Sequence, residues 1–304
     1  MSGVSSRRRI SSDNLTYVFA AGATPVATVR SDELLTVETL DAYSGLLDGG
    51  LDVDDYLRRR TSTPMNPVTG PVAVEGAEPG DAIAIEIQAI RLDPTGYVAA
   101  TPGTGLLGDI PVEPAAGAFH VREQSLWMDG AIELPLRPMI GTIGLAPADG
   151  ESRSLELGYH GGNLDFAEIT TGTTLYLPVR VPGGLLALGD VHASMGFCEA
   201  HSGVNISAEV DLRIELLKGM DWPRPWFETA GEIMTVGVAV QLVDALKEAA
   251  SAMEQELIRR LEITPTQARM LTGSTVDLRL GQGGGYGVNV SAYAAFPKIS
   301  LPGV

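Results

Sequence analysis

Short apolar segments separated by turn-forming residues are the feature that most constrains the fold of this chain. Ile83, Ile85 and Ile87 fall on one face of an extended segment, whereas Glu86 and Gln88 fall on the other. This two-residue period is typical of a half-buried β-strand. Comparable segments recur along the chain, and 36 glycines and 19 prolines in 304 residues supply turns between them. The pattern predicts a mainly β protein.

One pair of these segments predicts a β-hairpin. Residues 175–181 alternate between apolar and polar positions, residues 185–188 are apolar, and Pro182-Gly183-Gly184 separates the two segments. Proline and glycine at this point favour a tight reversal of the chain. The second strand of the predicted hairpin would end at Asp190 and His192.

Helical periodicity is found only near the C-terminus. Apolar residues at spacings of three and four predict a helix over about residues 237–261. Residues 264–267 then combine an N-cap threonine, a proline and a capping-box glutamine, which predict a second, short helix. We therefore expect a flexible arm over residues 1–14, a mainly β catalytic region over 15–220 and an α+β region over 221–304 packed on the same core. The apolar stripe of the longer helix also predicts a homo-oligomer, with a dimer as the expected form.

The composition narrows the classes of partner. The formal net charge is −17, which produces a field that repels nucleic acid. No run approaches about 18 apolar residues, so we expect no membrane span, and Arg7, Arg8 and Arg9 are not followed by the apolar segment of a secretory signal. Cys198 is the only cysteine, which excludes an intramolecular disulfide. We expect a cytoplasmic protein that acts on a small molecule.

Polar residues suited to chemistry are concentrated between His160 and His201. Asp190 and His192 are two residues apart, so on a strand both side chains point to the same face and can share one ion or one water molecule. Histidine together with carboxylates is a common ligand set for a catalytic metal. The alternative is that both residues only hydrogen-bond a neighbouring loop at the end of the strand.

Two further features in this stretch have more than one interpretation. Gly161 and Gly162 predict a tight turn whose exposed N–H groups could stabilise an oxyanion, although an ordinary β-turn explains the same residues. Glu199 could act as a general base toward a metal-bound water, or it could be a solvated surface glutamate.

Several sequence blocks, taken in order, resemble the acetamidase/formamidase family. The blocks are Asp41-Ala42-Tyr43-Ser44-Gly45, Asn66-Pro67-Val68-Thr69-Gly70-Pro71 with residues 74–81, residues 138–144, residues 160–165, and Gly189-Asp190-Val191-His192-Ala193. The resemblance implies β-sandwich and barrel-like sheets with a smaller C-terminal α+β part. It also implies an enzyme that hydrolyses small carboxamides to the acid and ammonia and that often carries a divalent metal ion.

The expected site residues fall into three groups by role. The metal ligands are Asp165, Asp190 and His192. The catalytic residues are Glu199, His160 and Asn163. The substrate-binding residues are Gly161, Gly162, Met195, Phe197 and Asn205. For the metal itself, zinc is favoured and calcium is the alternative.

The segment after His192 departs from the family pattern, which leaves three functions open. The glutamine and aspartate that the family usually carries there are replaced by Met195 and Phe197, and Asn205 stands near an expected acid. Such changes would make the pocket larger or drier. Metal-assisted amide hydrolysis is our first hypothesis. The alternatives are a non-hydrolytic descendant acting on a bulkier metabolite by isomerisation, cyclisation or elimination, and a non-catalytic binding protein.

Overall fold

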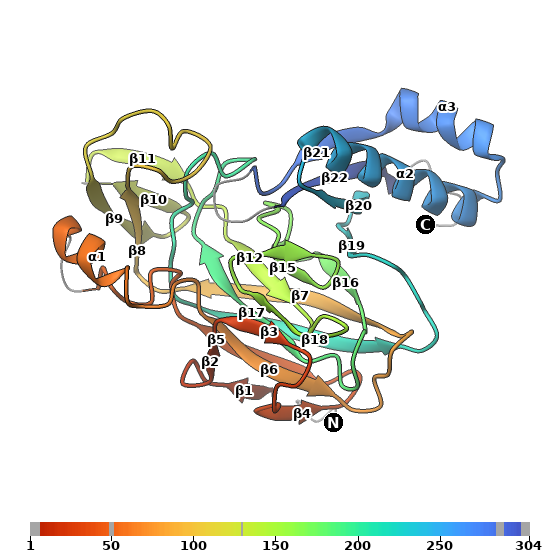
Figure 1. Cartoon of the computed structure of the whole chain (residues 1–304), viewed down its shortest axis with the longest axis horizontal. Helices are drawn as coiled ribbons and strands as arrows, with labels where there is room; N and C mark the ends of the chain where they lie inside the picture. The colour runs from red at the N-terminus through yellow and green to blue at the C-terminus, as the bar shows by residue number, and fades with distance from the viewer. Residues whose placement is uncertain (1–6, 49–51, 129, 284–288, 299–304) are drawn as a thin grey trace.

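The alternating isoleucines lie in strand β7 (Ala82–Leu92), at the centre of the larger of two stacked sheets (Figure 1). The structure is a computed structural model that describes residues 7–48, 52–128, 130–283 and 289–298. The side chains of Ile83, Ile85 and Ile87 are fully buried, as the two-residue period predicts. The mainly β prediction is confirmed.

Within the described ranges, the larger sheet has nine strands, and all neighbours are antiparallel except β1 and β5. In spatial order the strands are β1 (Arg8–Ile10), β5 (Leu34–Thr39), β18 (Ala208–Leu217), β7, β16 (Thr174–Pro178), β19 (Trp226–Glu228), β20 (Glu232–Ala239), β22 (Val290–Pro297) and β21 (Asp277–Leu280). Strand β1 lies within the arm predicted over residues 1–14, so that part of the arm pairs with the sheet.

A second sheet packs against the first and carries the polar cluster described below. Its strands, in order, are β14 (Leu157–Gly158), β15 (Gly161–Asn163), β12 (Met139–Gly144), β17 (Leu186–His192), β6 (Val68–Val74) and β2 (Leu15–Thr16), with β4 (Ala27–Val29) pairing with β6. Ile140 and Leu188 from this sheet share one apolar core with Ile85 from the larger sheet. Burial of this shared face supplies the main driving force for stacking the two sheets.

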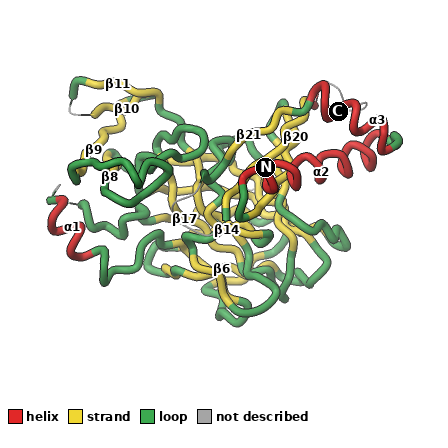
Figure 2. The backbone as a smooth tube through the Cα atoms, turned by 45° about the horizontal axis from the view of Figure 1, so that its top comes forward, coloured by secondary structure: helices red, strands yellow, loops and turns green. Residues whose placement is uncertain are grey.

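Smaller elements flank the sandwich at its two ends, as Figures 1 and 2 both show. One end carries a meander of β8 (Thr95–Ala100), β9 (Ala115–Arg122), β10 (Ser125–Met128) and β11 (Ile132–Pro135), together with α1 (Val53–Arg59). The opposite end carries α2 (Leu242–Leu261) and α3 (Pro265–Thr275). A short pair, β3 (Val18–Ala20) and β13 (Glu151–Arg153), completes the described strands. None of the described helices has the length and apolar character of a membrane span.

The C-terminal helices form where the sequence predicts them, with one boundary shifted. The capping box joins Thr264 and Gln267 at the start of α3. Helix α2 begins at Leu242 rather than near residue 237, because residues 232–239 continue the larger sheet as β20. Helix α2 then packs its buried alanines and Met253 on β20 and β22.

The predicted hairpin between residues 175–181 and 185–188 is wrong. Strand β16 pairs with β7 and β19 in the larger sheet, whereas β17 pairs with β12 and β6 in the second sheet. Residues 182–184 therefore connect two stacked sheets instead of two paired strands. Both arrangements bury the same alternating apolar residues, so the sequence pattern alone does not choose between them.

Close packing between α2 and β20 gives a stability prediction. A Cβ atom at Gly237 would overlap the carbonyl oxygen of Ala245 and lie 2.5 Å from the Ala249 amide nitrogen. We expect Gly237→Ala to lower the free energy of unfolding by about 1–3 kcal/mol because the helix must move away from the sheet. Gly231→Ala is the matched control, since a Cβ there meets open space. If the two variants unfolded at the same urea concentration, the close packing of α2 on β20 at Gly237 would not contribute to stability as we expect.

Candidate active site

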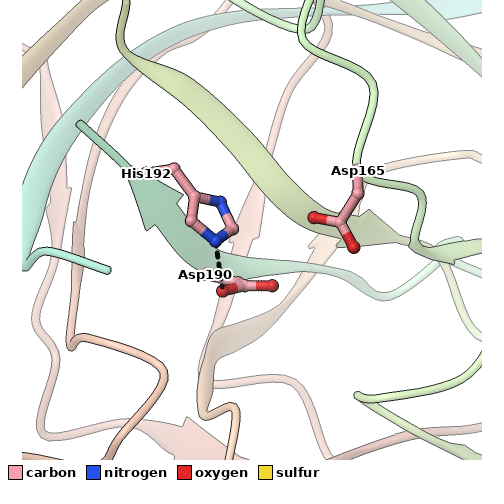
Figure 3. A group of neighbouring side chains, drawn as sticks. All are labelled: Asp165, Asp190 and His192. Carbon is pink, nitrogen blue, oxygen red and sulfur yellow. Dashed lines mark ion pairs between the residues drawn. The ribbon is translucent and has the colours of Figure 1, made fainter. Parts of the chain in front are cut away.

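Three buried side chains from the second sheet converge on one point (Figure 3). Asp190 and His192 lie on β17, and Asp165 follows β15. His192 Nε2 lies 3.7 Å from Asp190 Oδ1, and one potential ligand atom from each of the three residues lies within 4.8 Å of the others. All three side chains are buried. The spacing of two on a strand thus places the aspartate beside the histidine, and a residue distant in sequence completes the group.

Glu199 and Gln282 contact this group of three residues. Gln282 Nε2 donates hydrogen bonds to Asp165 Oδ2 at 2.9 Å and to Glu199 Oε2 at 2.7 Å. The other oxygen of Glu199 lies 3.7 Å from His192 Nε2. Glu199 is only 6% exposed, which excludes the interpretation of a solvated surface glutamate. Gln282 is a site residue that the sequence analysis missed.

A hydrogen-bonded layer next to Asp190 contains two more residues that the sequence analysis missed as site residues. The Thr142 hydroxyl lies 2.6 Å from Asn163 Oδ1 and 3.2 Å from Asp190 Oδ2. Asn66 Nδ2 donates to Thr142 Oγ1, to Asn163 Oδ1 and to the Ser154 carbonyl. A backbone carbonyl can only accept, so the Ser154 contact fixes which amide atom of Asn66 is the nitrogen.

Burial of like charges dominates the electrostatics of the group. Burial, followed by repulsion from Glu199 and Asp190, raises the pKa of Asp165 well above its usual value. Burial and the Asp190 charge raise the pKa of Glu199 to about 8. Burial lowers the pKa of His192 and keeps its imidazole neutral. In the described residues no lysine or arginine forms an ion pair with Asp165, Asp190 or Glu199.

The backbone around the carboxylates adopts conformations that non-glycine residues rarely populate. Asn66, Asp165, Asp190 and Glu199 all have positive φ angles, of 60°, 49°, 54° and 39°. A Cβ atom at Gly141 would lie 2.6 Å from Asp165 Oδ1 and 2.8 Å from Asp190 Oδ2. Strained residues of this kind gather at functional sites, where the surrounding structure holds them in place.

A cavity of about 130 Å³ opens onto this group. The described residues that line it are Ala42, Tyr43, Tyr56, Arg60, Met65, Asn66, Ala99, Thr101, Thr104, Leu155, Asn163, Asp190, Glu199, Ser202 and Asn205. Two lining residues, Asn66 and Asn205, are buried and have side-chain oxygens without a hydrogen-bond partner among the described atoms. An unpaired buried acceptor is costly, so each of these oxygens marks a polar group that the described residues leave unsatisfied.

His160, which the sequence analysis treats as catalytic, lies outside this lining. Its ring packs edge-on against Phe19 with ring centroids 5.3 Å apart, and it borders a separate surface pocket beside Glu156. Burial lowers the pKa of His160 to about 4, so its ring is neutral near pH 7. The structure therefore does not bring His160 to the carboxylates.

Gly161 and Gly162 form strand β15, so the predicted tight turn is wrong. Both have positive φ angles, of 98° and 96°. A Cβ atom at Gly161 would overlap the carbonyl oxygen of Ile143, and one at Gly162 would overlap that of Glu156. Glycine at these positions allows neighbouring strands to approach closely.

The two apolar replacements after His192 do not line the cavity. Met195 is 4% exposed and packs in the interior, whereas Phe197 is 57% exposed. Among the predicted substrate-binding residues, the structure places Asn205 in the lining. The expected effect of the replacements, a larger or drier pocket, therefore has no basis in the described lining.

Asp165, Asp190 and His192 are suited to hold a divalent cation. Asp165 Oδ1 and His192 Nδ1 are buried and have no hydrogen-bond partner among the described residues. Two carboxylates and a neutral imidazole form a donor set that binds transition metals. A cation would also offset the repulsion that raises the pKa of Asp165.

Two relatives carry names that describe amide hydrolysis. An acetamidase from Mycolicibacterium smegmatis is 25% identical over 261 residues, covering 64% of this chain and 63% of the relative. A formamidase from Methylophilus methylotrophus is 23% identical over 254 residues, covering 64% of this chain and 61% of the relative. The chain thus spans about three fifths of the length of these two relatives.

Comparisons of the fold and of the whole sequence give the same assignment. The crystal structure of an acetamidase from Bacillus halodurans matches with a TM-score of 0.89 and 33% sequence identity, covering 96% of this chain and 97% of that chain. The family model described as "Acetamidase/Formamidase family" matches residues 19–155 and 149–282. The resemblance in the sequence blocks is thereby confirmed, and the chain belongs to the acetamidase/formamidase family.

Proposed function

We propose that this protein hydrolyses a small primary carboxamide to the acid and ammonia with the help of a divalent cation. The observation that carries the proposal is the buried group of Asp165, Asp190, His192 and Glu199 at one end of a small cavity. Three neighbouring carboxylates that pair with no lysine or arginine of the described residues are unfavourable in a structural core. They are well suited to a site that binds a cation and moves protons.

Asp165, Asp190 and His192 would hold the cation, and we favour zinc. An imidazole nitrogen with two carboxylates suits zinc, whereas calcium prefers six to eight oxygen ligands. When bound, a divalent cation supplies Lewis acidity that polarises a carbonyl group or lowers the pKa of water. Calcium remains the alternative that metal analysis would distinguish.

Glu199 would act as the general base and then as the acid. Glu199 is one of the residues that line the cavity, and its carboxylate would take a proton from the attacking water as the water oxygen bonds to the carbonyl carbon. It would then give that proton to the leaving nitrogen as the C–N bond breaks, releasing ammonia. Positive charge nearby would lower the pKa of Glu199 from about 8 and allow it to accept the proton near neutral pH.

Three asparagines that line the cavity would orient the amide. Asn66 and Asn205 have Oδ1 atoms without a hydrogen-bond partner among the described residues, and these atoms would accept the two N–H groups of a primary amide. Asn163 has its Oδ1 occupied by Thr142, so its Nδ2 group is free to donate to the carbonyl oxygen as negative charge develops there. Asn163, rather than the Gly161–Gly162 pair, is the proposed oxyanion donor.

The volume of the cavity supports a small substrate over the bulky metabolite of the alternative hypothesis. Pockets for drug-sized ligands occupy about 300–1,000 Å³, whereas this cavity is about 130 Å³.

The proposed compartment is the cytoplasm.

Replacing the proposed base gives the first functional prediction. With the cation loaded, we expect Glu199→Gln to lower kcat for ammonia release from formamide or acetamide by about 10²–10⁴-fold. Metal content, measured on the purified protein, should stay near that of the wild type because Glu199 is not a proposed ligand. Glu215→Gln, at an exposed position of β18, is the matched control. A Glu199→Gln enzyme with wild-type turnover would rule out the assigned role.

The raised pKa of Glu199 gives a prediction about stability in the metal-free protein. Folded Glu199 keeps its proton up to about pH 8, whereas the unfolded side chain ionises above about pH 4.3. The folded state therefore binds more protons than the unfolded state between these pH values. The free energy of unfolding then falls as pH rises, by about 1.4 kcal/mol per pH unit for each proton by which the two states differ. Denaturant titrations from pH 5 to 8 should show a shallower fall in Glu199→Gln and in cation-loaded wild type. If the free energy of unfolding had the same pH dependence in all three samples, the raised pKa would not belong to Glu199.

We also propose a homodimer through the C-terminal helices. Val243 and Met270, in α2 and α3, are 61% and 67% exposed, and apolar surface of this kind is often covered by a second subunit. Analytical ultracentrifugation should give about twice the monomer mass of 32.0 kDa, and Val243→Glu should shift the population toward monomer. A wild-type species near 32.0 kDa at all concentrations would contradict the dimer.

A further inference from the structure

The wall of the cavity that α1 contributes carries a positive charge. Arg60 follows α1, and its side chain lines the cavity together with Tyr56 and Thr101. Arg60 Nη1 donates a hydrogen bond to Thr101 Oγ1 at 3.2 Å, and the guanidinium carbon lies 5.6 Å from the centre of the Tyr56 ring. These contacts hold the guanidinium at the cavity wall.

Arg60 forms no ion pair with any residue in the described part of the chain. Its two neighbours, Arg58 and Arg59, both pair with Asp55 on the solvent side of α1. The chain has a formal net charge of −17, so carboxylates are abundant, and yet none belonging to a described residue lies within ion-pair distance of this guanidinium. An unpaired, partly buried arginine in such a chain is available to an anionic ligand.

The opposite charges that line the cavity do not pair with one another in the described part of the chain. Asp190 and Glu199 lie at the β17 side, and Arg60, at the α1 side, is the only basic residue of the described lining. A guanidinium has five N–H donors in a planar fork that matches a carboxylate, and the described contacts of Arg60 use one of them. A partly desolvated wall strengthens such a pairing relative to bulk water.

We propose that the substrate is a primary amide with a carboxylate at its other end, that is, the monoamide of a short dicarboxylic acid. The carboxamide group would lie at Asp190 and Glu199, and the carboxylate would pair with Arg60. The inference rests on the proposed amide hydrolysis and deepens it by adding a charge requirement. Arg60 is a specificity-determining residue in this arrangement and takes no part in bond breaking.

The test compares monoamides with neutral amides of similar size. With the cation loaded, kcat/KM should be higher for malonamate and succinamate than for malonamide, propionamide and butyramide, mainly through a lower KM. Arg60→Gln should lower the ratio of anionic to neutral kcat/KM at least tenfold, and Arg60→Lys should recover part of it because the charge returns without the planar fork. Arg58→Gln, on the same turn of helix but paired outside the cavity, should keep the wild-type ratio.

A binding measurement separates this inference from the proposed function. Malonate and succinate should raise the melting temperature of the wild type and of Arg58→Gln, but not of Arg60→Gln. Hydrolysis of neutral and anionic amides with equal kcat/KM, and a ratio unaffected by Arg60→Gln, would overturn the charge requirement while leaving amide hydrolysis intact. Absence of ammonia from every amide would instead refute the proposed function. The shift in melting temperature with malonate or succinate would then still test whether Arg60 binds a carboxylate.

Discussion

The structure around the site depends on holding three carboxylates together in the interior, beside a neutral His192 and with no lysine or arginine paired to them in the described residues. Asp165, Asp190 and Glu199 repel one another, and burial removes the water that would screen them. The fold opposes that repulsion with fixed donors, chiefly Gln282, which bonds both Asp165 and Glu199. In the proposed mechanism, a divalent cation would provide the remaining compensation and would make Glu199 a usable base, so cation binding and catalysis would be coupled through one electrostatic balance.

The stacked sheets explain how such an unfavourable group is held in place. Strand β17 lies inside the second sheet, where Gly189 pairs with both neighbouring strands and Val191 pairs with β12. These paired neighbours hold Asp190 in place despite its positive φ. Gly141, on the neighbouring strand β12, leaves the space that the carboxylates occupy. Gln282 follows β21, which is the edge strand of the larger sheet. Forming the site therefore requires both sheets to be assembled, and the strain at Asp190 is offset by the rigidity of the sandwich.

Features that depend on local spacing could be predicted from the sequence. The alternation in β7, the capping box of α3 and the pairing of Asp190 with His192 are all of this kind. Contacts between distant segments could not be predicted in the same way. Gln282 has no local motif that marks it, and the strands on either side of residues 182–184 have the same apolar pattern whether they pair or stack. His160 shares a sequence block with Asp165, but it borders a separate pocket beside Glu156, and nothing in the spacing of the block distinguishes the two placements.

The two ends of the cavity belong to structurally different parts of the molecule. The end with Asp190 and Glu199 is built on the second sheet and on the loop after β17, where packing leaves little freedom to change. The other end is formed by α1 and by the segment after β8, at the periphery of the sandwich (Figure 1). Substitutions at the periphery cost less stability than substitutions inside a paired sheet. An arginine can therefore be placed at the cavity wall without disturbing the carboxylates, so the proposed preference for an anionic amide would require no change in the residues proposed for hydrolysis.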